Sequence, residues 1–538
     1  MPSSQQQRSP QRPEPQPLRL PSALLLASIS AVLIAVPTLW EVLWPCTWIA
    51  LLPLLLALRN ASLGRAFVLG WWTETLAIWI GFHWLIGTMV HFGFIPLPLS
   101  LLFLAIMGVG NGIRLGLFAA WLRLTTGQPT WWSRLWLPAC TYVAVDYLFP
   151  RVFPWYLGFT QFPVKPIIQI ADLTGIHGIT FLLLLTSTVG SMFFPHPSQP
   201  SPTTRRAMAA VVAALLLLSL GYAAWRMPQI TRAMQQATSL RLALIQPNIG
   251  IDEKDNRSSN REHLHTQIDM SRTTLAEQPD LIIWPESMYP YALPTQTQHL
   301  ALPTIQQTHS AHWLIGALTY THDQANQRHI FNSALLVAPD RRIIARYDKQ
   351  VLLAFGEYIP LQRYLPFLRH ISPTIGNLTP GTGSLLTLPN GVSIGSLICY
   401  EDILPRLARR AIRQGAQLLV NLTNDAWFGQ TRAPYQHRTL AAFRAVEHRV
   451  YLVRVTNTGL TSIIDPLGHE QGALPIYQRR TRIHNVQPLR LGTLYTRFGD
   501  WFAQLCSSAA ILLPLLQWRR KNGGLRRKGK RVEAVRKR

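Results

Sequence analysis

The feature that most constrains this chain is a series of long apolar stretches separated by short loops. A helix needs about 20 apolar residues to cross the hydrocarbon core of a bilayer, where lipid offers the backbone no hydrogen-bond partner. We therefore expect an all-α transmembrane bundle of about eight helices, although Pro53 interrupts the second stretch and the fifth contains Arg134 and Asp146. The stretches cover residues 21–39, 44–58, 66–90, 97–122, 132–150, 167–194, 206–225 and 498–518.

The basic residues between the stretches predict an orientation. Loops on one side carry pairs of arginines, and the chain ends in a run rich in Lys and Arg. Loops on the other side are poorer in both, except near 151–165, and cytoplasmic loops are the ones enriched in basic residues. The expected order is a basic cytoplasmic tail at 1–20, seven helices within 21–226, a periplasmic domain at 240–490, a final helix at 498–518 and a basic cytoplasmic tail at 519–538.

Composition narrows the functional classes. Only 14% of residues are charged and 48% are apolar, as expected for a protein in a bilayer. The net charge of +26 arises from tails, loops and one polar region that lack a nucleic-acid-binding signature, so we expect no nucleic-acid partner. The four cysteines form no CxxC pair and no metal-like spacing, so we expect no disulfide framework, metal or cofactor.

The polar region at 240–490 predicts a different fold. Short β-rich runs such as LRLALIQPNI, NSALLVAP and AQLLVNLTND alternate with polar segments of helical character. Buried strands with intervening helices indicate an α/β layered domain whose sheets are covered by helices. Charged or nucleophilic residues that follow such strands often form sites.

Three apolar runs are followed by charged or nucleophilic residues. Glu286 follows DLIIW, Lys349 and Glu357 lie in YDKQVLLAFGEYIP, and Cys399 ends VSIGSLIC. A thiol becomes a strong nucleophile only beside a base or a cation. Glu286 can take the thiol proton, and Lys349 can stabilise the thiolate and the oxyanion of a tetrahedral intermediate. Together they make a self-consistent acyl-transfer device.

Each residue also has a structural alternative. A single cysteine at a strand end is usually a buried small side chain. A Glu after Trp-Pro can cap a helix, and Lys349 beside Asp348 can form a surface ion pair. The combination of residues, rather than any one of them, favours the catalytic interpretation.

The wider motifs make the resemblance specific. QPNI, WPES, YDK, FGEYIP, ICYED and NDAWFG at 424–429 resemble the nitrilase superfamily and, within it, the apolipoprotein N-acyltransferase branch. The order of seven helices, a polar domain and one helix is similar too. Two departures are Ala354, where Pro is common before FGE, and Asn457-Thr458-Gly459, where a second Asn before Gly is common.

The resemblance implies a nitrilase-like α-β-β-α sandwich inserted in the bundle, with Glu286, Lys349 and Cys399 as the catalytic triad. It implies that Glu357 assists the triad and that Tyr400 and Glu401 support the site behind the nucleophile. Two further residues are candidate lipid contacts in the NDAWFG loop, namely Trp427 and Phe428. The roles of five polar residues near the predicted helices stay open, namely Asp146, Arg151, Lys165, Asp172 and His177.

The implied reaction moves an acyl chain from a membrane phospholipid to Cys399 and then to the α-amino group of a diacylated apolipoprotein. We expect a multi-pass protein of the bacterial inner membrane, because both substrates are anchored in the bilayer. We expect it to act as a monomer. The main alternative is a membrane-tethered nitrilase-type amidase that hydrolyses water-soluble amides or nitriles. A transporter or receptor is disfavoured, since we find few charges in the spans and no broken-helix repeat.

Overall fold

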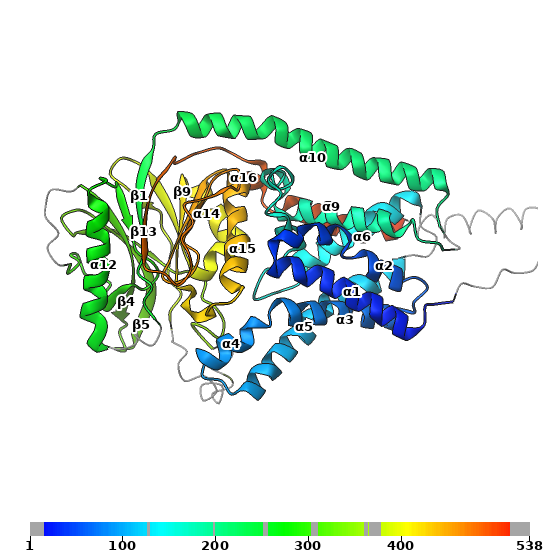
Figure 1. Cartoon of the computed structure of the whole chain (residues 1–538), viewed down its shortest axis with the longest axis horizontal. Helices are drawn as coiled ribbons and strands as arrows, with labels where there is room; N and C mark the ends of the chain where they lie inside the picture. Colours follow the sequence, from blue (N-terminus) through cyan, green and yellow to red (C-terminus); the bar gives the residue numbers. More distant parts are fainter. Residues whose placement is uncertain are drawn as a thin grey trace, which may run out of the picture.

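The structure is a computed structural model that describes residues 16–125, 130–196, 199–250, 257–302, 310–359, 364 and 378–516. Most of the predicted tail at 1–20 and the whole tail at 519–538 lie outside these residues. Figure 1 shows a group of helices at one end and a two-sheet domain at the other, with the long helix α10 (Pro202–Gln236) running between them. At about 1.5 Å per residue α10 is roughly 50 Å long, so it can cross a bilayer core of about 30 Å and still reach the sheets.

Several apolar helices form the first part. In the described residues, α1 (Leu20–Leu39), α5 (Leu97–Thr125) and α10 are long and apolar enough to cross a membrane. The stretch predicted at 167–194 is a bent pair, in which Lys165–Thr174 and Ile176–Ser191 (α9) meet at 120°. The bend is at Gly175 (φ 63°), where a Cβ would lie 2.6 Å from the ring of Tyr495.

The remaining apolar stretches are shorter or interrupted. Residues 44–58 form a 3-10 helix (Glu41–Ile49) and the short α2 (Leu52–Ala57), and Pro53, which was predicted to interrupt this stretch, lies in the first turn of α2. The stretch at 66–90 divides into α3 (Leu63–Gly81) and α4 (Trp84–His91). The fifth stretch is α6 (Trp131–Leu148), and the last contains Trp501–Leu516. At most four described helices meet the length and apolarity expected of a span, so the count of eight stays a prediction.

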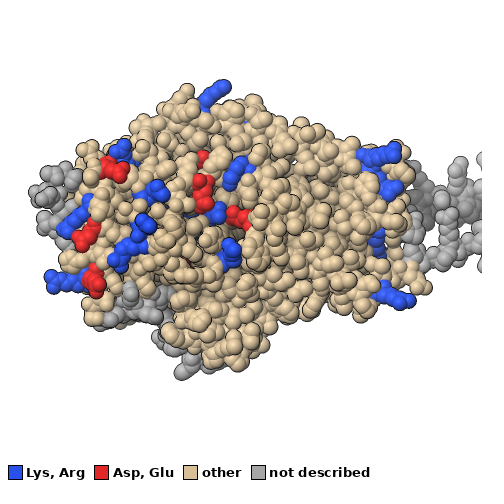
Figure 2. Space-filling view, viewed as in Figure 1, with Lys and Arg blue, Asp and Glu red and all other residues tan. Residues whose placement is uncertain are grey.

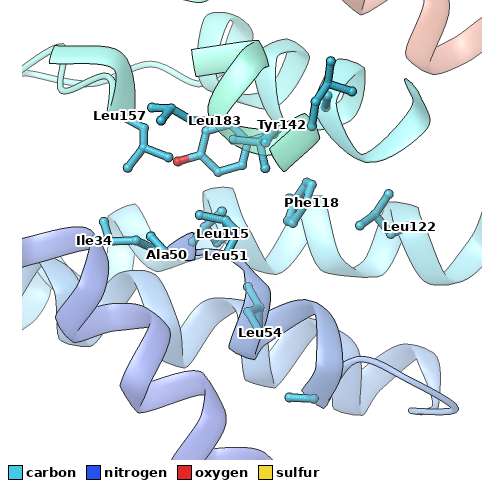
Figure 3. Packing of buried hydrophobic residues seen from close by; sticks show 14 of the residues in the cluster. Ile34, Ala50, Leu51, Leu54, Leu115, Phe118, Leu122, Tyr142, Leu157 and Leu183 are labelled. Atoms are coloured by element: carbon cyan, nitrogen blue, oxygen red, sulfur yellow. The ribbon is translucent and has the colours of Figure 1, made fainter. Parts of the chain in front are cut away.

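The helices pack around one large apolar cluster. Figure 3 shows Ile34, Leu54, Phe118 and other side chains of this cluster between the helices. α3 and α5 approach so closely that a Cβ on Gly70 would lie 2.1 Å from the carbonyl oxygen of Leu115. Small residues allow such close helix packing in membranes.

Charged side chains are distributed unevenly between the helices and the two-sheet domain. In Figure 2, charged side chains gather over the two-sheet domain and at the far end of the helices, with a broad zone almost free of charge between them. This zone covers the apolar helices and suits the hydrocarbon of a bilayer.

The second part contains two sheets. In the first, the strand order is β13 (Arg480–Val486), β1 (Leu240–Gln246), β2 (Leu281–Ile283), β4 (His312–His322), β5 (Arg328–Val337) and β6 (Ile343–Asp348), and β3 (Tyr289–Pro294) pairs with β4. In the second, the order is β12 (Glu470–Gln471), β11 (Ser462–Ile464), β10 (Tyr451–Thr456), β9 (Leu418–Thr423), β8 (Ser393–Ile398) and β7 (Leu386–Thr387). The strand pairs β1–β2, β2–β4, β8–β9 and β9–β10 are parallel, so the carboxyl ends of these strands lie at the same edge of their sheet.

Helices cover the outer faces of both sheets. Apolar residues of the two inner faces, including Leu242, Leu244 and Ile394, belong to one buried cluster. Helix α12 (Asn260–Leu275) contributes Leu264 and Ile268 to a cluster on the first sheet. Helices α14 (Pro405–Gln414) and α15 (Ala433–His448) cover the second sheet, where α15 lies between it and the apolar helices (Figure 1).

Candidate active site

The predicted nucleophile begins a turn at the end of a buried strand. Strand β8 ends at Ile398, and Cys399 begins the 3-10 helix Cys399–Ile403 with a φ of 51°. This left-handed conformation is strained for a residue with a side chain and is common at functional sites. Asn421 stabilises it by donating a 3.0 Å hydrogen bond to the Cys399 carbonyl oxygen. Burial and the nearby Glu286 carboxylate raise the pKa of the Cys399 thiol well above its usual range, although Lys349 opposes this.

Glu286 follows β2, in the other sheet, and is almost fully buried. Its Oε1 accepts a 2.7 Å hydrogen bond from Asn332 Nδ2, and its Oε2 accepts one of 2.9 Å from the Asn424 backbone amide. The Nζ of Lys349 lies 3.7 Å from Glu286 Oε1. The carboxylate is therefore held in place by two donors and faces one ammonium.

Lys349 directly follows β6 and is buried. Its ammonium donates a 2.8 Å hydrogen bond to Glu357 Oε1, while the Leu353 amide donates one of the same length to Glu357 Oε2. Burial alone would lower the pKa of Lys349, but the Glu286 and Glu357 carboxylates outweigh it and raise this pKa. The lysine thus stays charged, and the negative charge of a Cys399 thiolate also raises its pKa.

Glu401 lies two residues after the cysteine and is completely buried. One oxygen accepts from the backbone amides of Gln350 and Val351, and the other accepts from the Ile398 amide and the Tyr347 hydroxyl. Burial raises the pKa of Glu401, while Lys349 and these hydrogen bonds act against the rise. Glu401 thereby joins the end of β8 to the segment that follows Lys349.

The aromatic candidates lie toward the apolar helices. The Tyr400 hydroxyl donates to the carbonyl oxygen of Val152, so this side chain contacts the helical part rather than the sheet behind the cysteine. Phe428 makes an edge-to-face contact of 5.3 Å with Trp84 of α4. Trp427 is 44% exposed, and its role as a lipid contact stays a prediction.

The sequence interpretation missed the residues that hold these groups in position. Asn332 is a polar residue inside β5, where an amide in an otherwise apolar strand was a usable signal. Asn424 is oriented by Asn457, whose Nδ2 donates a 3.0 Å hydrogen bond to Asn424 Oδ1. The first Asn of the Asn457-Thr458-Gly459 segment, which departs from the common pattern, therefore has a structural role. No spacing in the sequence indicated either contact.

The residues with open roles form internal contacts. Asp146 pairs with Arg114 and Arg151, and Asp172 pairs with Arg226 and with Arg449 of the two-sheet domain. His177 is buried against the rings of Tyr147 and Tyr156. The Lys165 ammonium donates to the Phe162 carbonyl and lies over its ring. Among the described residues, no group of three or more His, Cys, Asp or Glu side chains is placed to hold a metal.

The two facing sheets, with a cysteine at the end of a buried strand, define a carbon–nitrogen hydrolase type of domain. Residues 241–494 match the carbon-nitrogen hydrolase family, and residues 27–189 match the apolipoprotein N-acyltransferase N-terminal domain. The chain belongs to the apolipoprotein N-acyltransferase family. This membership disfavours the amidase alternative.

Two apolipoprotein N-acyltransferases support the assignment along nearly the whole chain. The apolipoprotein N-acyltransferase of Geobacter metallireducens is 34% identical over 93% of this chain and 96% of its own length. That of Gloeobacter violaceus is 31% identical over 89% and 90%. Among solved structures, Nit3 of Saccharomyces cerevisiae is 18% identical with a TM-score of 0.35, over 46% of this chain and 90% of its own. An amidase from a Nesterenkonia species has the same identity with a TM-score of 0.34, over 51% and 97%.

Proposed function

We propose that this protein moves a fatty acyl chain from a membrane phospholipid to the α-amino group of the diacylglyceryl-cysteine that begins an apolipoprotein. Cys399 is the nucleophile, Glu286 the general base and acid, and Lys349 the group that stabilises the oxyanion. Glu357 holds Lys349, and Glu401 holds the turn that carries the nucleophile. The observation that carries the proposal is the geometry around Lys349, whose Nζ lies 3.7 Å from Glu286 Oε1 and 2.8 Å from Glu357 Oε1.

The first step forms an acyl-enzyme. Cys399 attacks the ester carbonyl carbon of the phospholipid while its thiol proton passes to Glu286. The tetrahedral intermediate carries an oxyanion that the Lys349 ammonium stabilises. The carbon–oxygen bond of the ester then breaks, Glu286 returns the proton to the departing oxygen, and a lysophospholipid leaves a thioester on Cys399.

The second step regenerates the thiol. The lipoprotein amine attacks the thioester carbonyl and loses a proton to Glu286. The carbon–sulfur bond breaks as the amide forms, and the proton goes to the Cys399 sulfur. Water must stay away from the thioester until the amine arrives, and the aromatic residues between the site and the apolar helices suit that requirement.

The proposed setting is the bacterial inner membrane. The two-sheet domain is an α-β-β-α sandwich on the periplasmic side, the bundle has eight spanning helices, both termini are cytoplasmic, and the protein acts as a monomer without a cofactor. The charge-free zone in Figure 2 supports immersion of the helical part in lipid. A reporter fused near residue 300 is expected to be periplasmic and one at the C-terminus cytoplasmic, and a cytoplasmic signal near 300 would contradict the orientation.

The decisive experiment separates the two steps. Purified protein is incubated with phospholipid alone, and mass spectrometry is used to find an acyl adduct on Cys399. A diacylated lipopeptide is then added, and transfer of the chain to its amine is measured. Cys399→Ala is expected to abolish both signals, whereas Cys46→Ala, which changes a cysteine in the apolar part, is expected to leave them intact. Hydrolysis of the donor without any transfer would contradict the proposal and favour the amidase alternative.

A further inference from the structure

A buried histidine joins the two turns that carry the site. His437 lies on α15, and its two ring nitrogens face two different carboxylates. Nε2 is 2.9 Å from Asp402 Oδ1, and Nδ1 is 3.0 Å from Asp425 Oδ1. Both aspartates are completely buried or nearly so.

This geometry fixes the protonation of the ring. A neutral imidazole has one N–H and one lone pair, so it can donate to only one carboxylate. Burial alone would raise the pKa of Asp425, but the nearby His437 and Arg454 outweigh it and lower this pKa. With both carboxylates ionised, the two short contacts place protons on both nitrogens, which makes His437 an imidazolium. Arg454 of β10 supplies the second cation, since it donates to Asp402 and lies 3.8 Å from Asp425 Oδ2. Two carboxylates and two cations then form a neutral buried cluster, which avoids the cost of unpaired buried charge.

The two aspartates belong to the segments that hold the catalytic groups. Asp402 lies in the same 3-10 helix as Cys399, three residues further on. Asp425 begins the 3-10 helix Asp425–Phe428, directly after Asn424, whose amide holds Glu286. A single imidazolium therefore ties the turn of the nucleophile to the turn that orients the base.

The same segment of α15 is tied to the apolar helices. Gln436, next to His437, accepts a 2.9 Å hydrogen bond from Trp84 Nε1 and donates one of 3.1 Å to the Gly81 carbonyl. Phe428 lies with its ring edge-on to both Trp84 and His437. These contacts fix the segment that joins the two turns relative to α3 and α4, where lipid-anchored substrates would arrive.

We propose that His437, as an imidazolium at neutral pH, is a positioning residue that sets the separation of Cys399 from Glu286. This inference rests on the proposed acyl transfer and adds a residue that touches no substrate. Burial alone would lower the pKa of His437, but Asp402 and Asp425 raise it to about 9 against the opposing charge of Arg454. The charged form is therefore present at neutral pH and is lost as the pH rises through about 9.

The test compares His437→Gln with a double variant that also carries Asp425→Asn. Glutamine removes the positive charge and leaves two carboxylates beside one Arg454, whereas the double variant restores neutrality with Asp402 and Arg454 alone. His469→Gln is the matched control, because His469 pairs with Asp465 at 3.2 Å with its side chain 44% exposed. The readout is the rate of thioester formation on Cys399 as a function of phospholipid concentration and pH.

We expect His437→Gln to lower the maximal acylation rate by about tenfold to a hundredfold, because small misplacements of reacting groups have effects of this size. The phospholipid concentration at half-maximal rate should change by less than about twofold, and the control should match wild type. The double variant should recover most of the rate, and the ratio of wild-type to double-variant rates should fall above pH 9, where the imidazolium loses its proton.

Three results would overturn the inference while leaving the proposed function intact: wild-type acylation in His437→Gln, a double variant no faster than the single one, or a constant rate ratio across pH 9. The second result would indicate that the positive charge of the histidine does not determine the rate. If wild type itself forms no thioester, the proposed function fails instead, so the two failures are distinguishable.

Discussion

Lys349 donates a 2.8 Å hydrogen bond to Glu357, whose second oxygen accepts the Leu353 amide. The ammonium is therefore fixed by a carboxylate that is itself fixed by the backbone. Glu286 lies farther from the ammonium, at 3.7 Å, and takes its hydrogen bonds from Asn332 and Asn424. In the proposed reaction, this division leaves Glu286 available to exchange a proton, while Glu357 keeps Lys349 charged and in place.

Glu357→Gln tests this division. Glutamine keeps an acceptor for Lys349 but removes the charge, and charged hydrogen bonds exceed neutral ones by about 1 kcal/mol. We expect the acylation rate of Cys399 to fall by about fivefold, which corresponds to that difference in transition-state stabilisation. Asp340→Asn is the control, because its pair with Arg342 is exposed and such pairs contribute little. An unchanged rate in Glu357→Gln would show that Glu357 does not assist Lys349.

The pH dependence of Cys399 alkylation tests the electrostatics of the site. Burial and Glu286 raise the pKa of the thiol, and Lys349 lowers it. Because the thiolate is the form that reacts, iodoacetamide should modify wild-type Cys399 slowly at neutral pH and faster as the pH rises. Glu286→Gln removes a raising charge and should shift the profile to lower pH, whereas Lys349→Met should shift it to higher pH.

Mass spectrometry of the peptide that contains Cys399 measures this profile separately from the other cysteines. Both variants should lose most of their acyl transfer despite their opposite shifts, since losses in a group that acts as a unit are individually large. Shifts of the same sign in the two variants would show that the two side chains do not act on the thiol as neighbouring charges.

Sequence patterns predicted the individual groups better than their partners. A polar residue just after a buried strand was enough to single out Glu286, Lys349 and Cys399. The structure places them after β2, β6 and β8, which belong to two different sheets. Their approach depends on how the sheets face each other, which no local pattern encodes, and it was the family resemblance that implied it.

Helix continuity was the harder property to predict. The stretch at 167–194 is largely apolar, yet it bends by 120° at Gly175, where a positive φ and a close contact with the Tyr495 ring favour a residue without a side chain. The polar partners of Asp172 were equally hidden, since Arg449 lies 277 residues further along the chain. Contacts between the two parts of the molecule arise from folding and leave no periodic signal.

Arg449→Met tests the attachment of the catalytic domain to the helices. Arg449 is completely buried and donates to the Asp172 carboxylate, to both oxygens of Gln169 and to the Pro466 carbonyl. Removing one member of a buried ion pair usually costs about 3–5 kcal/mol. We expect faster proteolysis between the two parts and a lower rate of acyl transfer, both measured in detergent micelles.

Arg272→Met serves as the control for Arg449, because Arg272 lies on the exposed face of α12, where its side chain is 44% exposed. It should leave both the cleavage pattern and the transfer rate within about twofold of wild type. Unaltered proteolysis in Arg449→Met would show that apolar contacts alone hold the domain.

The buried charges among the apolar helices allow a sharper test, because one substitution can be compensated by another. Arg114 lies 2.7 Å from Glu74 and 2.6 Å from Asp146, and all three side chains are buried. Arg114→Met leaves the Glu74 carboxylate without this guanidinium, whereas Asp146 keeps Arg151 at 2.9 Å. We expect the free energy of unfolding to fall by about 3–5 kcal/mol, measured by thermal denaturation in detergent.

Adding Glu74→Met should recover most of the lost stability, because apolar side chains of similar volume often replace a buried ion pair without cost. A double variant as unstable as the single one would instead locate the loss in the contacts of Arg114 with Asp146 and Tyr142, which the second substitution does not relieve.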